Sequence, residues 1–258
     1  MTLPIPDPTM FLLVLARVAG LVVGSPIFGH MLVPIRVRVG LALVLAIALG
    51  GALGPPAASA PTSLLGLVGA LAVESALGAT IGLVAQFIFA GVLLGGQLAG
   101  IQMGFGLANL IDPQSHAQLT IVAQWQQLMA LLIFLVLDIH HLLIGALLAS
   151  FHSVPPGGLM MSALGVRGTV ALAGEMFALG VRIAAPVMVA LLLTNAALGI
   201  LARTIPQLNV FVVGFPVNVG VGLLMLGASL PFTFRLLAAR FTGLESTLDS
   251  LVRGFAHG

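Results

Sequence analysis

The chain contains no cysteine, no tyrosine and no lysine, and only 6% of its 258 residues are charged. Without cysteine it can form neither disulfides nor thiolate metal sites. So few charges cannot cover the surface of a soluble domain, whereas a lipid bilayer accepts apolar side chains on every face of a helix. With 60% hydrophobic residues, the composition predicts an all-α integral membrane protein.

The nine cationic residues are all arginine, and they are scattered along a chain whose net charge is +2. They form no basic patch, which excludes a nucleic-acid partner. The chain also lacks the Gly-x-Ser-x-Gly, His-Glu-x-x-His and phosphate-loop motifs of serine hydrolases, zinc proteases and nucleotide-driven pumps. We therefore predict no catalytic residues, no cofactor and no enzymatic activity.

Long uncharged stretches cover residues 39–73, 75–111 and 204–234, and each exceeds the roughly 20 residues that one membrane crossing needs. About six apolar segments follow from this pattern. We predict helices from Met10 to about Phe28, Val39 to about Leu53, Leu64 to about Leu107, about His116 to Leu137, about Val170 to Ala202 with a kink at Pro186, and Leu208 to about Leu230. Residues 235–258 suit an amphipathic helix.

Only a few charged or strongly polar residues fall inside the predicted helices, among them Arg17 and Glu74. Intramembrane charges usually face protein or water. Glu175 and Arg182 are seven residues apart, so we do not expect them to pair directly. We expect Asn195 to form a hydrogen bond to a neighbouring helix.

Glycines recur at four-residue spacing within the predicted helix 64–107, as the pairs Gly78/Gly82 and Gly91/Gly95 and the row Gly96, Gly100 and Gly104. Small residues with this spacing line one face of a helix and let the backbone of a neighbouring helix come close. The pattern predicts tight helix–helix contacts along this segment.

A break follows at Asn109 and Asp112-Pro113, because proline lacks a backbone donor and disfavours helical geometry in the residue before it. Asp112 and Ser115 can each cap the next helix. An irregular backbone inside a bilayer must be buried in protein or border water. Either this apolar loop faces a protein-lined space, or it is an ordinary interfacial turn between two crossings; the residues alone leave both open.

The densest group of titratable side chains is Asp138, His140 and His141, with His152 further along. These residue types can bind metal ions. Adjacent residues of a helix, however, project about 100° apart. We therefore expect that His140 and His141 do not face one ion, and we predict no metal site.

Three segments resemble a known family: GIQMGFGLANLIDPQSH at 100–116, LTNAALGILARTIPQLNVFVVGFPV at 193–217 and SPIFGHMLVPIRVRVGLAL at 25–43. They are similar to the FliR family of bacterial flagellar export proteins and to its injectisome counterparts. The length and the segment order match over essentially the whole chain. The resemblance implies long broken helices and helical hairpins within a closed helical assembly, the type III export gate.

By this resemblance, residues 1–258 form a single export-gate membrane domain, with about 1–169 similar to FliP and about 170–258 forming a FliQ-like helical hairpin with an amphipathic tail. The implied role is that of a structural subunit in the bacterial inner membrane, at the flagellar basal body. The implied partners are FliP-like and FliQ-like subunits, other membrane proteins of the FlhA/FlhB type, membrane lipid, and the unfolded proteins that are secreted.

The resemblance also implies site residues. The family's apolar channel plug corresponds to Gly106, Leu107, Ala108, Asn109, Leu110, Ile111 and Asp112. Some relatives carry phenylalanine where this chain has Leu107 and Leu110, and a narrow aliphatic ring can also exclude water. The residues expected in helix packing and assembly are Gly96, Gly100, Gln102, Met103, Gly104, Asn195, Arg203, Pro206, Gln207, Gly214, Phe215 and Pro216.

Other functions remain as alternatives. An injectisome gate subunit would share the same architecture. A secondary transporter would usually show related halves and a polar site near the bilayer midplane, and the chain has no convincing internal repeat. An intramembrane metalloenzyme built on Asp138, His140 and His141 is the third alternative.

Overall fold

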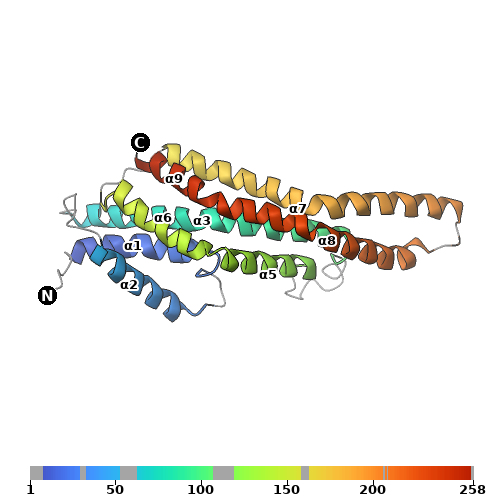
Figure 1. Ribbon diagram of the computed structural model, residues 1–258, viewed down its shortest axis with the longest axis horizontal. Helices are drawn as coiled ribbons and strands as arrows, with labels where there is room; N and C mark the ends of the chain where they lie inside the picture. Colours follow the sequence, from blue (N-terminus) through green and yellow to red (C-terminus); the bar gives the residue numbers. More distant parts are fainter. Residues whose placement is uncertain are drawn as a thin grey trace. The chain divides into compact units, whose positions relative to one another are not determined.

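The structure is a computed structural model, and it describes residues 8–29, 33–52, 63–106, 119–157, 163–205, 207 and 209–256. In these ranges the regular elements are all helices, as the composition predicts (Figure 1). They are α1 (Pro8–Gly24), α2 (Ile35–Ala52), α3 (Leu64–Gln102), α5 (Ile121–Val136), α6 (Ile139–Ser153), α7 (Ala163–Thr204), α8 (Val210–Thr242) and α9 (Leu244–Ala256).

The chain divides into two compact units. One comprises residues 1–87, 135–173 and 241–258, and the other comprises residues 88–134 and 174–240. Three of the long helices, α3, α7 and α8, contribute residues to both units.

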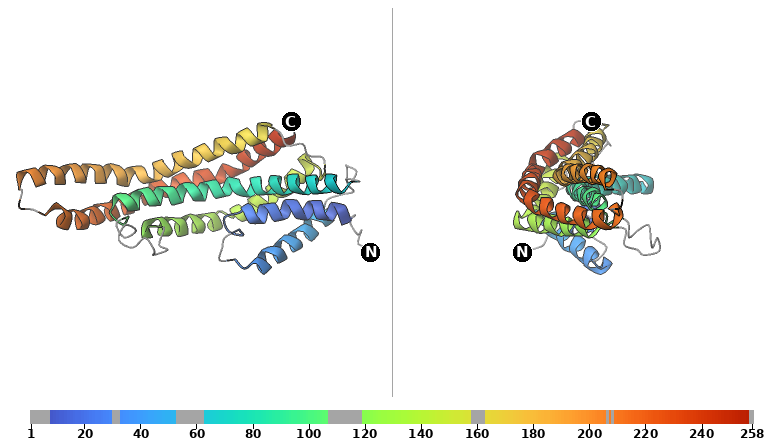
Figure 2. Two further views of the ribbon diagram at one scale, coloured as in Figure 1. Left: turned by 180° about the vertical axis from the view of Figure 1, so that it is seen from behind. Right: turned by 90° about the vertical axis from the view of Figure 1, so that its right-hand side faces the viewer.

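In the first unit, α1 lies beside α2 and along the first half of α3 (Figure 2). Helix α6 lies against α9. The buried side of α9 consists of Leu244, Leu248, Leu251 and Val252. The charged residues Glu245, Asp249 and Arg253 are exposed. The amphipathic helix predicted near the C-terminus is therefore present, over Leu244–Ala256.

In the second unit, α3, α5, α7 and α8 surround a common apolar core. Phe89 of α3 and Phe134 of α5 meet edge to face, with their ring centroids 5.6 Å apart. Met103, just after α3, is fully buried. It belongs to a cluster that also contains Ala99, Val122, Val187, Leu191 and Leu226. Four helices that are distant in sequence thus share one set of side chains.

The predicted helix 64–107 begins at Leu64 as expected but ends earlier, at Gln102. Gly104 adopts a φ of +100°. The Phe105 amide donates to the Gly100 carbonyl and the Gly104 amide donates to the Ile101 carbonyl, both at 3.0 Å. This pair of bonds is the Schellman arrangement, which satisfies the last carbonyls of a helix. Gly104 therefore ends the helix and does not extend the glycine row along it.

Other helices also differ from the prediction. Helix α2 begins at Ile35 instead of Val39, and α6 lies where the sequence pattern predicts no helix. Helix α1 ends at Gly24 instead of Phe28, immediately before Ser25-Pro26. Helix α5 begins at Ile121 instead of near His116. Its N-cap is Thr120, whose hydroxyl accepts a hydrogen bond from the Ala123 amide at 3.2 Å. The predicted caps Asp112 and Ser115 lie outside the described residues.

The C-terminal helices are longer than predicted. Helix α7 begins at Ala163, before Val170, and Gly168 in this extension lies close to the Leu251 side chain of α9. Helix α8 does not end near Leu230 but continues through Pro231 to Thr242. Of the two arginines in this extension, Arg240 pairs with Glu175 of α7. A proline is tolerated inside a membrane helix where neighbouring groups satisfy the freed backbone.

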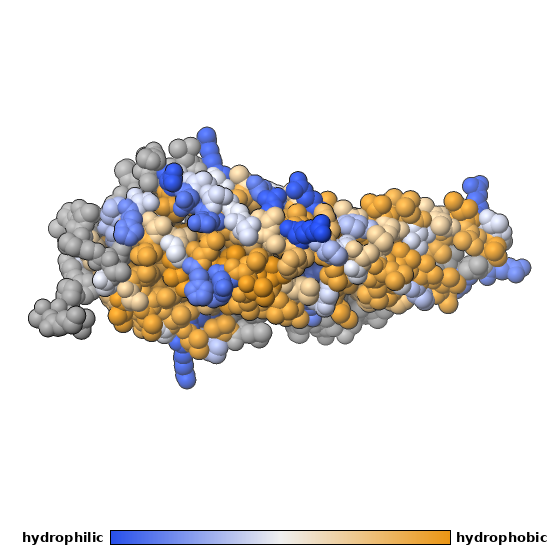
Figure 3. Space-filling view, viewed as in Figure 1, coloured by the Kyte–Doolittle hydropathy of each residue, from blue (hydrophilic) through white to orange (hydrophobic). Residues whose placement is uncertain are grey.

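Three described helical stretches are long and apolar enough to cross a membrane: Leu64–Gln102, Arg167–Thr204 and Val212–Phe255. The pair α5 and α6, bent by 63° at its break, would make a fourth. This is fewer than the six segments expected, because α1 is a shorter apolar helix and α2 is not among the described stretches that meet these criteria. Apolar side chains also cover much of the coloured face in Figure 3, which fits a chain surrounded by lipid or by other membrane subunits.

Replacing Gly104 with alanine should destabilise the protein by roughly 1–2 kcal/mol, because the left-handed backbone disfavours a Cβ atom. The added atom would also lie 2.9 Å from the Phe215 ring. The measurement is thermal unfolding of the detergent-purified chain. Gly106→Ala is the matched control, since its Cβ would make only an ordinary contact, at 3.4 Å from Ile101. Equal melting temperatures for the two variants would contradict the assignment of Gly104 as the helix cap.

Candidate functional site

A buried ion pair joins helices α1 and α3 in the first unit. The Nε atom of Arg17 in α1 lies 2.6 Å from Oε2 of Glu74 in α3. The side chains are 0% and 1% exposed. The sequence places both charges inside apolar helices but does not identify them as partners. The available signal was that each is a single charge within an otherwise uncharged run, with the opposite sign.

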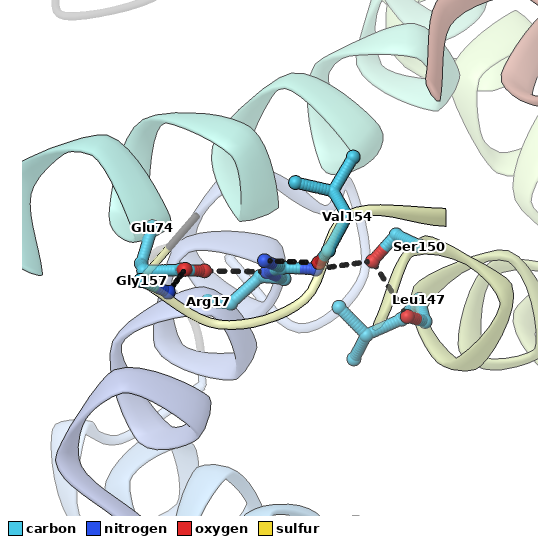
Figure 4. Close-up of polar contacts among 6 residues, drawn as sticks. All are labelled: Arg17, Glu74, Leu147, Ser150, Val154 and Gly157. Carbon is cyan, nitrogen blue, oxygen red and sulfur yellow. Dashed lines mark hydrogen bonds and ion pairs between the residues drawn. The ribbon is translucent and has the colours of Figure 1, made fainter. Parts of the chain in front are cut away.

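The other polar atoms of this pair are also satisfied (Figure 4). Arg17 donates through one terminal nitrogen to the Ser150 hydroxyl at 3.1 Å and through the other to the Val154 carbonyl at 3.0 Å. The second carboxylate oxygen of Glu74 accepts from the Gly157 amide at 2.9 Å. This Arg17 network therefore connects α1, α3, α6 and the turn that follows α6.

Two contacts complete the surroundings of the guanidinium group. Its central carbon lies 4.3 Å from the centroid of the Phe151 ring, a cation–π arrangement. The Ser150 hydroxyl, which accepts from Arg17, donates to the Leu147 carbonyl at 2.7 Å. A buried charge costs a large desolvation energy unless it is paired and hydrogen-bonded, and this guanidinium is both.

The ion pair is possible because the backbones of α1 and α3 come very close. Glu74, Gly78 and Gly82 are spaced four residues apart and share one face of α3. A Cβ atom on Gly78 would overlap the Arg17 carbonyl oxygen, and one on Gly82 would lie 2.6 Å from the Gly24 carbonyl carbon. Larger residues at these positions would separate the helices and move the carboxylate away from Arg17.

The glycines predicted in the middle of α3 face other helices of the second unit. A Cβ atom on Gly96 would lie 2.5 Å from Cα of Ala123 in α5. One on Gly100 would overlap the Thr120 side chain. Thr120 also donates from its amide to the Gln97 side chain at 2.8 Å. Gly96 and Gly100 thus allow α3 and α5 to come close within this chain. Gln102, another predicted assembly residue, is half-buried near the helix cap at Gly104.

Polar contacts also join α7 and α8. The side-chain amide of Asn218 donates to Asn195 Oδ1 at 2.9 Å, which confirms the hydrogen bond expected for Asn195. Glu175 pairs with Arg240 at 2.5 Å, so the described residues bear out the expectation that Glu175 does not pair with Arg182. Helices α7 and α8 run antiparallel beside each other where these asparagines meet (Figures 1 and 2).

The remaining predicted assembly residues lie near the ends of α7 and α8. Arg203 and Gln207 are exposed, and Pro206 lies outside the described residues. Gly214 is buried, whereas Phe215 is 46% exposed and Pro216 is exposed within α8. Of the predicted plug only Gly106 is described, and residues 107–112 lie outside the described part of the chain.

The side chains of His140 and His141 lie closer together than the 100° projection of adjacent helix residues suggests. Asp138 lies in the turn before α6, and its side chain and those of both histidines bring one ligand atom each to within 4.8 Å of the others. The two imidazole rings tilt toward each other, with their centroids 4.1 Å apart. The 100° projection describes Cβ directions, and the long rings bend back over the preceding turn.

Breaking the buried ion pair should cost about 3–5 kcal/mol of unfolding free energy, because Glu74→Gln leaves the Arg17 charge buried and unpaired. Denaturant unfolding in detergent measures this cost. Glu175→Gln is the matched control, since it removes a partly exposed pair worth about 0–1 kcal/mol. The double variant Arg17→Met/Glu74→Gln should lose less than the sum of the single variants. Additive losses would show that the two groups do not act as a pair.

The chain is similar to known proteins over most of its length. The model of the family described as bacterial export proteins, family 1, matches residues 9–244. The flagellar biosynthetic protein FliR of Bacillus subtilis (strain 168) is 35% identical over 247 residues, 94% of each chain. FliR of Escherichia coli (strain K12) is 34% identical over 217 residues, 84% of this chain and 82% of its own. FliR of Caulobacter vibrioides is 32% identical over 222 residues, 84% of this chain and 87% of its own. With the family pattern spanning nearly all of the described helices, the chain belongs to the bacterial export proteins, family 1.

Proposed function

We propose that this protein is a structural subunit of the flagellar type III protein export gate, in the bacterial inner membrane at the flagellar basal body. The observation that carries the proposal is family membership over residues 9–244, together with relatives named as flagellar biosynthetic proteins at 32–35% identity. These names favour the flagellar role over the injectisome role.

The surface of the second unit supports a role in an assembly. Large apolar side chains are exposed along α7 and α8; they include Val189, Leu192, Leu193, Ile200, Val212, Leu223 and Leu224. An open hollow of about 560 Å³ also lies beside Pro186, and Arg182 is the only charged residue among its lining side chains. Apolar surface of this extent requires lipid or protein to cover it. FliP-like and FliQ-like subunits would provide the protein part of that cover.

The proposal also assigns two different portions to the chain. Residues from 1 to about 169 would form the FliP-like portion, and residues from about 170 to 258 would form the FliQ-like hairpin and tail. The antiparallel contact between Asn195 and Asn218 supports a hairpin in the second portion. Unfolded flagellar proteins would pass through the closed ring, and FlhA/FlhB-type membrane proteins would adjoin it.

The channel plug would be the segment from Gly106 to Asp112. The Schellman cap at Gly104 supports this placement, because it turns the chain out of α3 immediately before the segment begins. In a narrow conduit, apolar side chains can exclude water and ions without a charged barrier.

A deletion strain tests the proposed role in export. Loss of the gene should abolish secretion of hook and filament proteins into the medium, and the intact gene should restore it. Copurification with FliP-like and FliQ-like subunits from the native membrane should yield one stable complex. Normal secretion without the gene, or isolation of a lone monomer that transports a small solute in liposomes, would contradict the proposal.

Deletion of residues 106–111 tests the plug. We expect the gate to assemble while the membrane becomes permeable to ions, because the apolar obstruction is removed. Membrane conductance and copurification of the gate subunits are measured on the same strain. Unchanged conductance with an assembled gate would exclude the plug assignment.

A further inference from the structure

The turn between α5 and α6 carries an unusual residue for the start of a helix. Asp138 has a φ of 52° and is the only non-glycine residue with positive φ in the described part of the chain. It occupies the N-cap position of α6, but its side chain makes no capping hydrogen bond. Its backbone carbonyl accepts from the His141 amide at 2.9 Å. The carboxylate is therefore not used in holding the helix end.

This free carboxylate lies close to two imidazole nitrogens. Oδ1 of Asp138 is 3.6 Å from Nδ1 of His141 and 3.9 Å from Nε2 of His140. These separations are too long for good hydrogen bonds. They are close to the roughly 3.4 Å between two ligand atoms that bind one tetrahedral ion with bonds of about 2.0–2.1 Å. The three ligand atoms, all from one short segment, lie within 4.8 Å of one another.

We propose that Asp138, His140 and His141 form a binding site for a divalent transition-metal ion of the Zn²⁺ class. Two imidazoles and one carboxylate are a ligand set that suits zinc, whereas Mg²⁺ and Ca²⁺ prefer oxygen ligands throughout. On the lone chain the Asp138 and His141 side chains are 72% and 71% exposed, and His140 is 26% exposed. The three protein ligands would leave a fourth position of a tetrahedral ion for water or for a partner's side chain.

The surroundings give such an ion a structural role. Asp138 precedes α6, and both histidines lie in its first turn, so one ion would fix the turn to the helix. The bound charge would also offset the carboxylate in a segment whose flanking helices are apolar. This site is independent of the export function proposed above, because it needs only this chain.

The test is a titration of the full-length chain, purified in detergent without a histidine tag, with Zn²⁺ alone. Isothermal calorimetry should show one ion bound for each chain. Asp138→Asn, His140→Asn and His141→Asn should each weaken binding by roughly tenfold or more. His152→Asn is the matched control, because His152 is an exposed histidine in the last turn of the same helix. It should leave the affinity unchanged.

Two further measurements separate a built site from weak binding to surface histidines. First, Co²⁺ in place of Zn²⁺ should give the visible absorption of a tetrahedral ion. Second, Zn²⁺ should raise the melting temperature of the wild type and of His152→Asn but not that of His141→Asn. With a chelator present, the three proteins should melt at the same temperature, because His141 is exposed. Binding that is insensitive to Asp138→Asn, or lost equally in His152→Asn, would overturn the proposal.

Discussion

A single buried charge, the guanidinium of Arg17, constrains how the helices of the first unit are arranged. It cannot be left unpaired in an apolar interior, so a carboxylate, a hydroxyl and a backbone carbonyl must all lie within reach. Those partners come from α3, from α6 and from the turn after α6. Helix α1, helix α3 and the end of α6 with its turn are distant in sequence, and they are held in one arrangement by the bonds of the Arg17 side chain.

In lipid, helices are held together by the close approach of their backbones, because hydrophobic burial gives little driving force there. Apolar side chains gain little by leaving lipid for protein, so helices associate through van der Waals contact and a few polar bonds. In the first unit Gly78 and Gly82 allow that contact with α1. In the second unit Gly96 and Gly100 allow it with α5, and the Asn195–Asn218 bond adds a polar contact between α7 and α8. Small residues and isolated polar residues therefore specify which helices are neighbours.

The sequence predicts these features unevenly, for physical reasons. Composition and periodicity identify most of the helices, but not α6. They also identify the start of α3 and the hydrogen bond of Asn195, because these depend on local pattern and on the lack of charge. In the extension of α8 beyond Pro231, Arg240 pairs with Glu175 of α7, and the Arg17–Glu74 pair joins residues 57 positions apart. Neither is visible in a local pattern. The closeness of the His140 and His141 rings depends on their side-chain conformations, which the Cβ directions of adjacent helix residues do not give.

The turn after α6 is held in place by main-chain groups, so its conformation depends little on most of its side chains. Val154 contributes a carbonyl and Gly157 contributes an amide, and both groups belong to the main chain. Almost any residue supplies such groups, so the anchoring bonds themselves tolerate substitution at most positions of this turn. The exception is Gly157, whose φ of +82° disfavours any side chain. Within the family, relatives that keep the buried arginine and glutamate should keep a glycine here while the neighbouring residues diverge.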